Sequence, residues 1–182
     1  MGILLPLNTA LNDGTPIVIR EIGPDDRCLL QEGFAQLSEQ SRFNRFLAPH
    51  PRLTDAELDL FTRPGDLSHF AIGAVGGPRD APVPLASARF VGLPDDPKRA
   101  EIALTVVDRH HRKGLGRRLL LLLGEEARPR GIEAFTALVH RDNLAVQSLF
   151  RTLGGQPIDR ATPEVEWLLP LPLQDLQRPV AA

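Results

Sequence analysis

Short runs of β-branched and other hydrophobic residues, separated by glycine, proline and aspartate, recur through most of the chain. Runs of this kind are typical of β-strands, whereas apolar residues three and four positions apart indicate helices. We expect strands at residues 17–22, 68–75, 85–91, 100–107, 132–139 and 164–169. We expect helices at residues 26–40, 54–61, 117–128 and 142–153, with a further short helix or turn at 41–47.

The connections between these elements indicate the fold class. Short turns join the strands at 68–75, 85–91 and 100–107, and this predicts an antiparallel meander. A helix separates the strands at 100–107 and 132–139, and this predicts parallel pairing through a right-handed crossover. We therefore expect an α/β fold, with a mixed, mostly antiparallel sheet of six to seven strands flanked by about four helices.

The length of 182 residues suits one folded domain, which we place at residues 15–170. Residues 1–14 are interpreted as a loose leader that ends in the turn signal Asn12-Asp13-Gly14. Residues 171–182 are interpreted as a proline-rich tail at the periphery of the domain.

Composition narrows the classes of partner and compartment. The net charge of −2 gives no global field that would attract nucleic acid or an anionic membrane, so neither partner is expected. The longest apolar run, Leu119–Leu123, is far too short to span a membrane. A single cysteine, Cys28, excludes an internal disulfide and favours a cytoplasmic protein, and we expect its thiol to be buried in the core rather than reactive.

A basic segment with two glycines, Gly114 and Gly116, leads from the strand at 100–107 into the helix at 117–128. The first N–H groups of a helix lack partners and, with the helix dipole, form an anion site. Glycine lets a phosphate approach the backbone because it has no Cβ. Basic residues at this helix end oppose the dipole, so we prefer a bound anion to the alternative of a tight turn with solvated side chains. The spacing matches neither a Walker loop nor a dinucleotide fingerprint.

The segment His111-Arg112-Lys113-Gly114-Leu115-Gly116 resembles the acetyl-CoA-binding motif Gln/Arg-x-x-Gly-x-Gly/Ala of the GCN5-related N-acetyltransferase (GNAT) superfamily. His111 departs from the motif, at a position that contributes mainly its backbone amide in such proteins. Downstream, residues 141–155 resemble the family's Asn-x-x-Ala-x-x-x-Tyr-x-x-x-Gly-Phe helix, with Asn143 in place and Phe150 where tyrosine is usual. The resemblance covers residues 16–170 and is nearest to the bacterial protein-lysine acetyltransferase branch.

This resemblance implies a GNAT-like sheet that is splayed between its fourth and fifth strands, at 100–107 and 132–139. The pantetheine arm of acyl-CoA is expected in that gap, and the pyrophosphate on the amides of residues 112–117. Asn143 lies near the pantetheine or serves only as a helix N-cap, and Phe150 packs against the cofactor or the core. The expected cofactor-binding residues are Thr105, Val106, Val107, His111, Arg112, Lys113, Gly114, Leu115, Gly116, Arg117, Asn143 and Phe150.

Glu101 is the candidate general base for acyl transfer to an amine. It is the only carboxylate in the apolar run 101–107, so we expect its pKa to be raised, and its spacing resembles that of the base in the lysine-acetyltransferase branch. The alternative is an exposed carboxylate paired with Lys98 or Arg99. The chain has no tyrosine, which leaves the family's usual proton donor unfilled.

The resemblance places the amine acceptor near residues 41–46, whose arginines Arg42 and Arg45 could select an acidic acceptor or contact the cofactor. The alternative is that these arginines face solvent while Phe43 and Phe46 enter the core. We expect an N-acetyltransferase that moves an acetyl or short acyl group from acyl-CoA to a primary amine, possibly a protein lysine, as a monomer or homodimer and without a metal. The alternatives are a non-catalytic acyl-CoA sensor and a nucleotide-binding domain.

Overall fold

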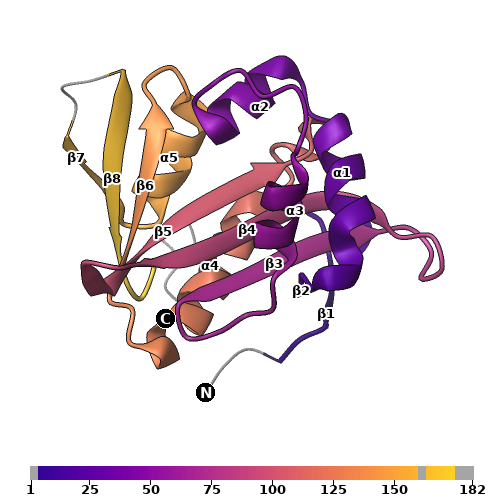
Figure 1. The fold of residues 1–182 in the computed structure, drawn as a ribbon, viewed down its shortest axis with the longest axis horizontal. Coiled ribbons are helices and arrows are strands. Elements are labelled where there is room, and N and C mark those ends of the chain that lie inside the picture. Colours follow the sequence, from indigo (N-terminus) through magenta and orange to yellow (C-terminus); the bar gives the residue numbers. More distant parts are fainter. Residues whose placement is uncertain (1–3, 160–162, 175–182) are drawn as a thin grey trace.

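The computed structural model describes residues 4–159 and 163–174 and has one mixed sheet with helices on both faces (Figure 1). The strands of the described chain are β1 Leu7–Ala10, β2 Pro16–Glu21, β3 His69–Gly76, β4 Val83–Leu93, β5 Asp96–Val106, β6 Ala134–His140, β7 Gln156–Asp159 and β8 Glu164–Pro170. The α-helices are α1 Arg27–Ala35, α2 Glu39–Phe46, α3 Asp55–Thr62, α4 Leu115–Ala127 and α5 Leu144–Thr152.

The order of strands in the sheet is β1-β2-β3-β4-β5-β6-β8-β7. Adjacent strands are antiparallel except β5 and β6, which are parallel, as the crossover through α4 requires. The expected fold class is confirmed, with eight strands in the described chain instead of six to seven, because the sequence did not predict β1 and β7. β1 pairs with β2 over Leu7–Ala10, so this part of the expected loose leader is wrong: it forms the edge of the sheet.

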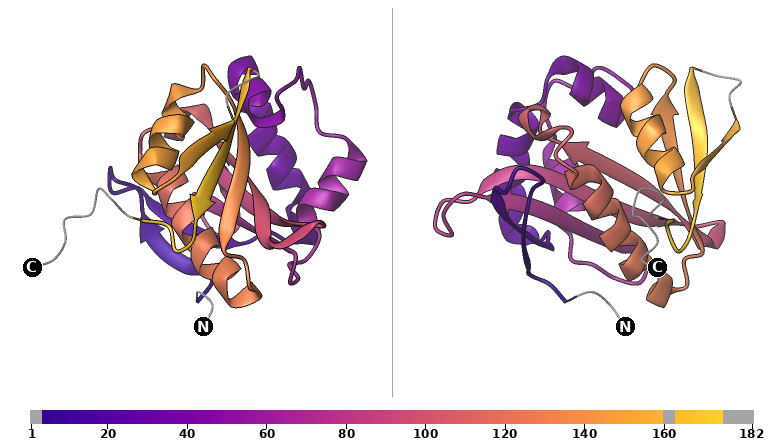
Figure 2. Two further views of the ribbon diagram at one scale, coloured as in Figure 1. Left: turned by 90° about the vertical axis from the view of Figure 1, so that its left-hand side faces the viewer. Right: turned by 180° about the vertical axis from the view of Figure 1, so that it is seen from behind.

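Helices α1, α2 and α3 cover one face of the sheet, and α4 and α5 cover the other (Figures 1 and 2). The face under α4 carries the larger core, in which Leu119, Leu120 and Leu123 are fully buried. Their spacing puts them on one side of α4, where they pack on the central strands. The opposite face has a smaller apolar cluster around Phe34 and Leu37, and this difference leaves room for polar residues there.

Helix α1 ends at Ala35, and a new helix, α2, begins at Glu39, where the sequence suggested one helix to residue 40. Ser38 stops the first helix because it is extended and its hydroxyl accepts a hydrogen bond from the Ser41 amide as the N-cap of α2. The break turns α2 away from α1 and places it across the open end of the gap between β5 and β6 (Figure 1).

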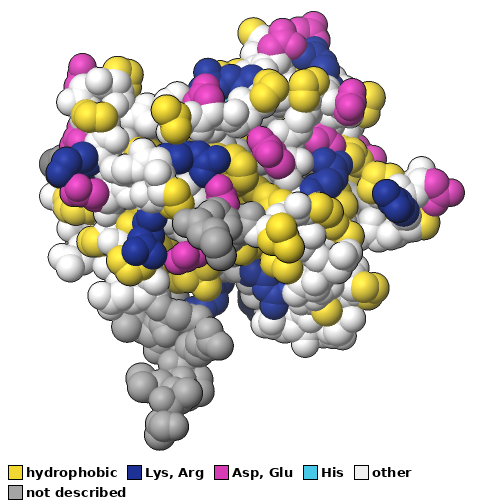
Figure 3. All heavy atoms as spheres, turned by 90° about the horizontal axis from the view of Figure 1, so that it is seen from below, with side chains coloured by type: hydrophobic (Ala, Val, Ile, Leu, Met, Phe, Trp, Pro, Cys, Tyr) yellow, Lys and Arg dark blue, Asp and Glu magenta, His cyan; other side chains and the backbone are white. Residues whose placement is uncertain are grey.

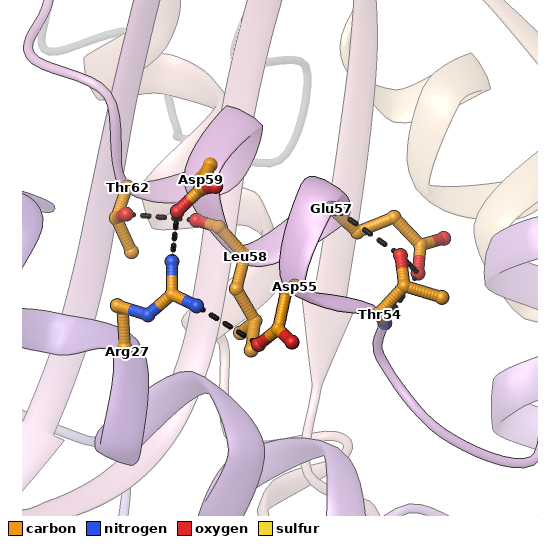
Figure 4. A network of polar contacts seen from close by, with 7 residues as sticks. All are labelled: Arg27, Thr54, Asp55, Glu57, Leu58, Asp59 and Thr62. Atoms are coloured by element: carbon orange, nitrogen blue, oxygen red, sulfur yellow. Dashed lines mark hydrogen bonds and ion pairs between the residues drawn. The ribbon is translucent and has the colours of Figure 1, made fainter.

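Helix α3 is held in place by its own cap and by α1 (Figure 4). Thr54 and Glu57 form the capping box that the sequence predicted, with both reciprocal bonds present. The Arg27 guanidinium of α1 donates to the carboxylates of both Asp55 and Asp59, so the two helices form one cover over the sheet.

The predictions for Cys28 and for the tail after residue 170 can also be compared with the structure. Cys28 is exposed on α1, so the prediction of a core thiol is wrong. Leu171 and Leu173, at the start of the expected peripheral tail, pack against the core near Gly124; residues 175–182 lie outside the described chain.

The face shown in Figure 3 has basic and acidic side chains interspersed with hydrophobic ones. Within the described ranges, no helix is both long enough and apolar enough to cross a membrane.

Candidate active site

The strands β5 and β6 separate soon after they meet. They pair only from Arg99 to Glu101 on β5 and from Ala134 to Thr136 on β6. Beyond Glu101, β5 continues to Val106 without a partner on that side, while β6 pairs along its whole length with β8. The result is the wedge between the two strands that the sequence analysis placed there, visible in Figure 1.

The backbone of β5 presents only some of its groups to this wedge. The amide of Val107 donates to the Leu85 carbonyl of β4, 2.9 Å away. In an antiparallel ladder alternate residues point their N–H and C=O groups to the same neighbour, so Thr105 also faces β4. Val106 faces the wedge, and its carbonyl accepts a hydrogen bond of 2.8 Å from Nε2 of His111. Of the three residues expected to pair with pantetheine, the backbone of Val106 alone has this orientation.

The loop after β5 provides a set of backbone donors at the start of α4. Gly114 is the N-cap, with a φ of 80°, and no side chain caps the helix. In the described chain, the amides of Arg112, Lys113, Gly114, Leu115 and Gly116 have no hydrogen-bond acceptor, and the ladder resumes at Arg118, which donates to the Gly114 carbonyl. Unpaired amides at a helix start bind anions.

His111 does not belong to this set of free amides. Its N–H donates to the Asp108 carbonyl at 3.1 Å, so the backbone role expected for it is already taken. Its ring instead bonds to Val106 and thereby joins the loop to the end of β5. The cradle for an anion therefore begins at Arg112.

The β1–β2 turn supports the loop from the other side. The Asn12 amide donates to the Lys113 carbonyl at 3.3 Å, and Lys113 Nζ lies 2.8 Å from Oδ2 of Asp13. This hydrogen bond from Lys113, with those from Thr15, lowers the pKa of the Asp13 carboxyl. The Lys113 side chain is thus bound to the turn, and the sequence had marked that turn without linking it to the loop.

Three arginines of this segment, Arg112, Arg117 and Arg118, have different surroundings. Arg118 donates to Thr9 Oγ1 at 2.7 Å and to the Ala10 carbonyl at 2.5 Å, so it fastens β1 to α4. Arg117 reaches Thr152 Oγ1 on α5 at 3.4 Å. Arg112 is exposed, with a φ of 59°. Arg112 is therefore the basic side chain of the loop that extends into solvent beside the free amides, whereas Arg117 is directed to α5.

Glu101 is the last residue of β5 that pairs with β6, and it lies at the point of the wedge. Its side chain is exposed, so the expectation of an apolar surrounding is wrong. The alternative pairing is wrong as well, because Lys98 pairs with Glu133 and Arg99 with Asp96. In the described chain the Glu101 carboxylate makes no side-chain hydrogen bond and no ion pair, which leaves it available to a substrate.

The two residues of α5 that the sequence analysis named, Asn143 and Phe150, both have partners within the fold. Asn143 is its N-cap, and Oδ1 accepts from the Val146 amide at 3.3 Å. Phe150 is 3% exposed and packs edge-on against Trp167, with ring centroids 5.7 Å apart. Of the two positions open for Phe150, the structure has it in the core.

Helix α2 closes the wide end of the wedge. The Phe43 ring packs edge-on against His140 of β6 at 5.5 Å. The start of α2 is bound to the loop after β5 through Asp108, whose carboxylate accepts from the Ser38 amide and from the Ser38 and Ser41 hydroxyls. Burial acts to raise the pKa of Asp108, but these hydrogen bonds outweigh it and lower the pKa. Sequence reasoning missed Asp108, although it follows the strand directly.

An apolar cavity of about 80 Å³ lies between the sheet and the cover formed by α1, α2 and α3. Its floor includes Ala103, Thr105 and Val107, the residues of β5 that follow Glu101 on the same face. Two arginines, Arg45 and Arg89, reach it from α2 and β4. The sequence analysis had not singled out Arg89, although it is the one charged residue in the run 85–91, which is the signal that had identified Glu101.

Comparison with known proteins agrees with this geometry. A sequence model of the acetyltransferase (GNAT) family matches residues 34–154. Acetyltransferase Pat of Mycolicibacterium smegmatis is 28% identical over 158 residues, which are 85% of this chain and 45% of Pat. The chain thus spans about half the length of that relative.

Solved structures share the fold. The crystal structure of the GNAT domain of S. lividans PAT has a TM-score of 0.82 at 27% identity and covers 91% of this chain and 96% of its own. The structure of yncA from Salmonella typhimurium with its cofactor acetyl-CoA has a TM-score of 0.65 at 19% identity, over 91% of this chain and 97% of its own. The family match includes the wedge, the loop and Glu101, and the chain belongs to the acetyltransferase (GNAT) family.

Proposed function

We propose that this acetyltransferase transfers the acetyl group of acetyl-CoA to a primary amine by direct attack, with Glu101 as the general base. The observation that carries the proposal is the combination of a wedge between β5 and β6 with a row of unpaired amides at its wide end. The row suits a diphosphate, and the wedge suits a narrow, amide-containing arm. Glu101 lies where the wedge narrows, on the face that α2 covers.

The chain's own groups fit acetyl-CoA. The free amides of residues 112–116 and the Arg112 and Arg117 side chains would hold the pyrophosphate through charge-assisted hydrogen bonds, each contributing about 1.5–3 kcal/mol. The Val106 N–H is the donor that β5 offers to the pantetheine arm. The bound substrate supplies a thioester, which the amine attacks.

As the general base, Glu101 would remove the proton that keeps the amine from attacking the thioester. A lysine-like amine has a pKa of about 10.4, so its neutral form at pH 7 costs roughly 4.6 kcal/mol. A positioned base supplies about 10²–10⁴-fold of the rate. Because Glu101 is exposed, we expect it to take the proton directly or through one water molecule.

The missing tyrosine does not prevent turnover on this scheme. Phe150 is buried against Trp167, so α5 directs no acid at the wedge from that position. A thiol with a pKa of about 8.5 leaves as the thiolate at a cost of only about 2 kcal/mol at pH 7. This small cost allows the thiolate to leave without a general acid. Since the amine attacks the thioester directly, no covalent enzyme intermediate is needed.

The acceptor is a primary amine, and we propose a small-molecule amine or a protein lysine. It would enter beside α2, since the opposite face of the wedge is covered by α4 and α5 (Figure 2). The family match favours this enzymatic function over a non-catalytic acyl-CoA sensor.

The test is release of the CoA thiol from acetyl-CoA over a panel of amines and lysine peptides. Glu101→Gln should lower turnover by about 10²-fold or more while acetyl-CoA affinity stays nearly unchanged. Glu133→Gln is the matched control, because Glu133 is an exposed carboxylate that directly precedes β6 and pairs with Lys98 of β5. Equal turnover of Glu101→Gln and wild type across pH would remove Glu101 from the mechanism.

A further inference from the structure

Two guanidinium groups meet at one aromatic ring beside the cavity. Arg89 of β4 is 9% exposed, and its Cζ lies 4.2 Å from the centroid of the Phe61 ring. Arg45 of α2 lies 5.6 Å from the same ring and 4.8 Å from that of Phe46. Aromatic faces attract such cations but do not neutralise them. The site thus places two positive charges on an apolar wall.

Neither arginine has a carboxylate within ion-pair distance among the described residues. Nη2 of Arg89 donates to the Leu60 carbonyl at 3.1 Å and to Nε2 of His69 at 3.3 Å. Nη1 and Nε of Arg89 have no acceptor among the described residues. Burial and the neighbouring Arg89 lower the pKa of His69 to about 4, so His69 is neutral and supplies no counter-charge.

The pKa values of both guanidinium groups are lowered, which is the direction expected of a cation that has no neighbouring counter-ion. Burial, with repulsion from Arg45 and Arg63, lowers the pKa of Arg89 to about 10. Arg45 is half-buried, and its partial loss of hydration also lowers its pKa, which the more distant carboxylates of Glu101 and Glu57 only partly oppose. A buried charge without a partner is costly, because its lost hydration is not replaced.

The rest of the cavity is suited to an aliphatic chain. Its other lining residues are apolar except for Ser87 and Thr105, and no carboxylate is among them. Its volume of about 80 Å³ is several times the roughly 10–15 Å³ that a single water molecule needs. Its floor continues along β5 to Glu101, so a ligand there would extend from the proposed reaction site.

We infer that this cavity binds the carboxylate end of a short aliphatic chain carried by one of the two substrates, with Arg89 and Arg45 as its counter-ions. The assignment to a substrate rests on the proposed function. The carboxylate belongs either to the acyl group, as in a dicarboxylic acyl-CoA, or to the amine acceptor. In both cases the site disfavours acceptors with extra positive charge, such as polyamines.

Binding of the anion is tested without turnover, by calorimetry with butyrate and its neutral isostere butyramide. Wild type should bind butyrate about tenfold more tightly than butyramide, as one charge-assisted hydrogen bond provides. The preference should vanish in Arg89→Gln and Arg45→Gln and persist in Arg89→Lys. Arg99→Gln, which removes an exposed arginine of β5, is the control and should keep it. Equal binding of the two probes by the folded wild-type protein would overturn the inference.

The source of the carboxylate is tested with two matched substrate pairs. Succinyl-CoA is compared with butyryl-CoA on a neutral amine, and 4-aminobutyrate is compared with butylamine in the presence of acetyl-CoA. At least a tenfold preference in kcat/KM for the acid of one pair, lost in Arg89→Gln, identifies the substrate that carries the carboxylate. No preference in either pair would overturn the assignment to a substrate. Because butyrate binding needs no catalysis, its result stays interpretable even if Glu101 is not the base.

Discussion

Gly114 is the residue through which the proposed cofactor cradle can be tested by a single methyl group. Its φ of 80° lies in the left-handed region, and an added Cβ would lie 2.8 Å from both Nδ2 and Oδ1 of Asn12. Asn12 is exposed, so its amide end can swing away at little cost. The substitution Gly114→Ala therefore acts chiefly through backbone strain.

The size of the effect follows from that conformation. For a residue with a Cβ, the left-handed conformation is less favourable by about 1–2 kcal/mol. If the loop keeps its shape, this strain lowers the free energy of unfolding. If the loop relaxes, the amides of residues 112–116 leave their positions. The protein must then restore the strained conformation when acetyl-CoA binds, and the binding free energy becomes less favourable by the same amount. A cost of 1–2 kcal/mol corresponds to a roughly 5–30-fold loss of affinity.

Gly131 is a matched control within the same chain. It also has a positive φ, 84°, at the end of the helical segment after α4, and no atom lies within 4 Å of an added Cβ. Gly131→Ala should lose about 1–2 kcal/mol of stability and keep its affinity for acetyl-CoA.

The assay combines urea unfolding with calorimetric titration of acetyl-CoA on both variants. For Gly114→Ala, the losses in unfolding free energy and in binding free energy should together reach about 1–2 kcal/mol. The reasoning fails if Gly114→Ala leaves both quantities unchanged. It also fails if Gly131→Ala weakens acetyl-CoA binding as much, because the cradle would then not depend on the loop.

Two further predictions concern the surroundings of the site. Because the pKa of Asp108 is lowered in the folded state, its hydrogen bonds from Ser38 and Ser41 stabilise the fold above about pH 4 and are lost as the pH falls through the folded-state pKa. Asp108→Asn should thus cost about 1 kcal/mol at pH 7 and flatten the acid limb of a plot of unfolding free energy against pH; an unchanged acid limb would contradict this. Phe150→Tyr should lower the unfolding free energy by about 1–3 kcal/mol, since its hydroxyl would be buried beside Trp167, and should not raise turnover; faster thiol release would place this position at the reacting atoms.

Much of the site was predictable because its parts are local in sequence. The donors at the start of α4 follow from two glycines placed between a strand and an apolar helix. The cap of α3 follows from Thr54 and Glu57, three residues apart. The divergence of the two parallel strands came from the family resemblance, and the pairing at three positions confirms it.

Other features were missed because their stabilising partners are distant in sequence. The four residues of β1 carry no strand pattern of their own and become a strand by pairing with β2. The apolar run around Glu101 suggested burial, yet its residues alternate between the two faces of the sheet, and the Glu101 side chain itself is exposed.

The order of elements, the free amides of the loop and the identity of the candidate base are set by short-range pattern, because helix caps, glycine conformations and strand alternation depend on a few neighbouring residues. The pairing of Lys113 with Asp13, the burial of Phe150 and the meeting of Arg45 with Arg89 are decided by packing. Whether a charge lies in water or against an apolar cavity depends on which helices cover the sheet. Those helices come from parts of the chain that no local pattern connects.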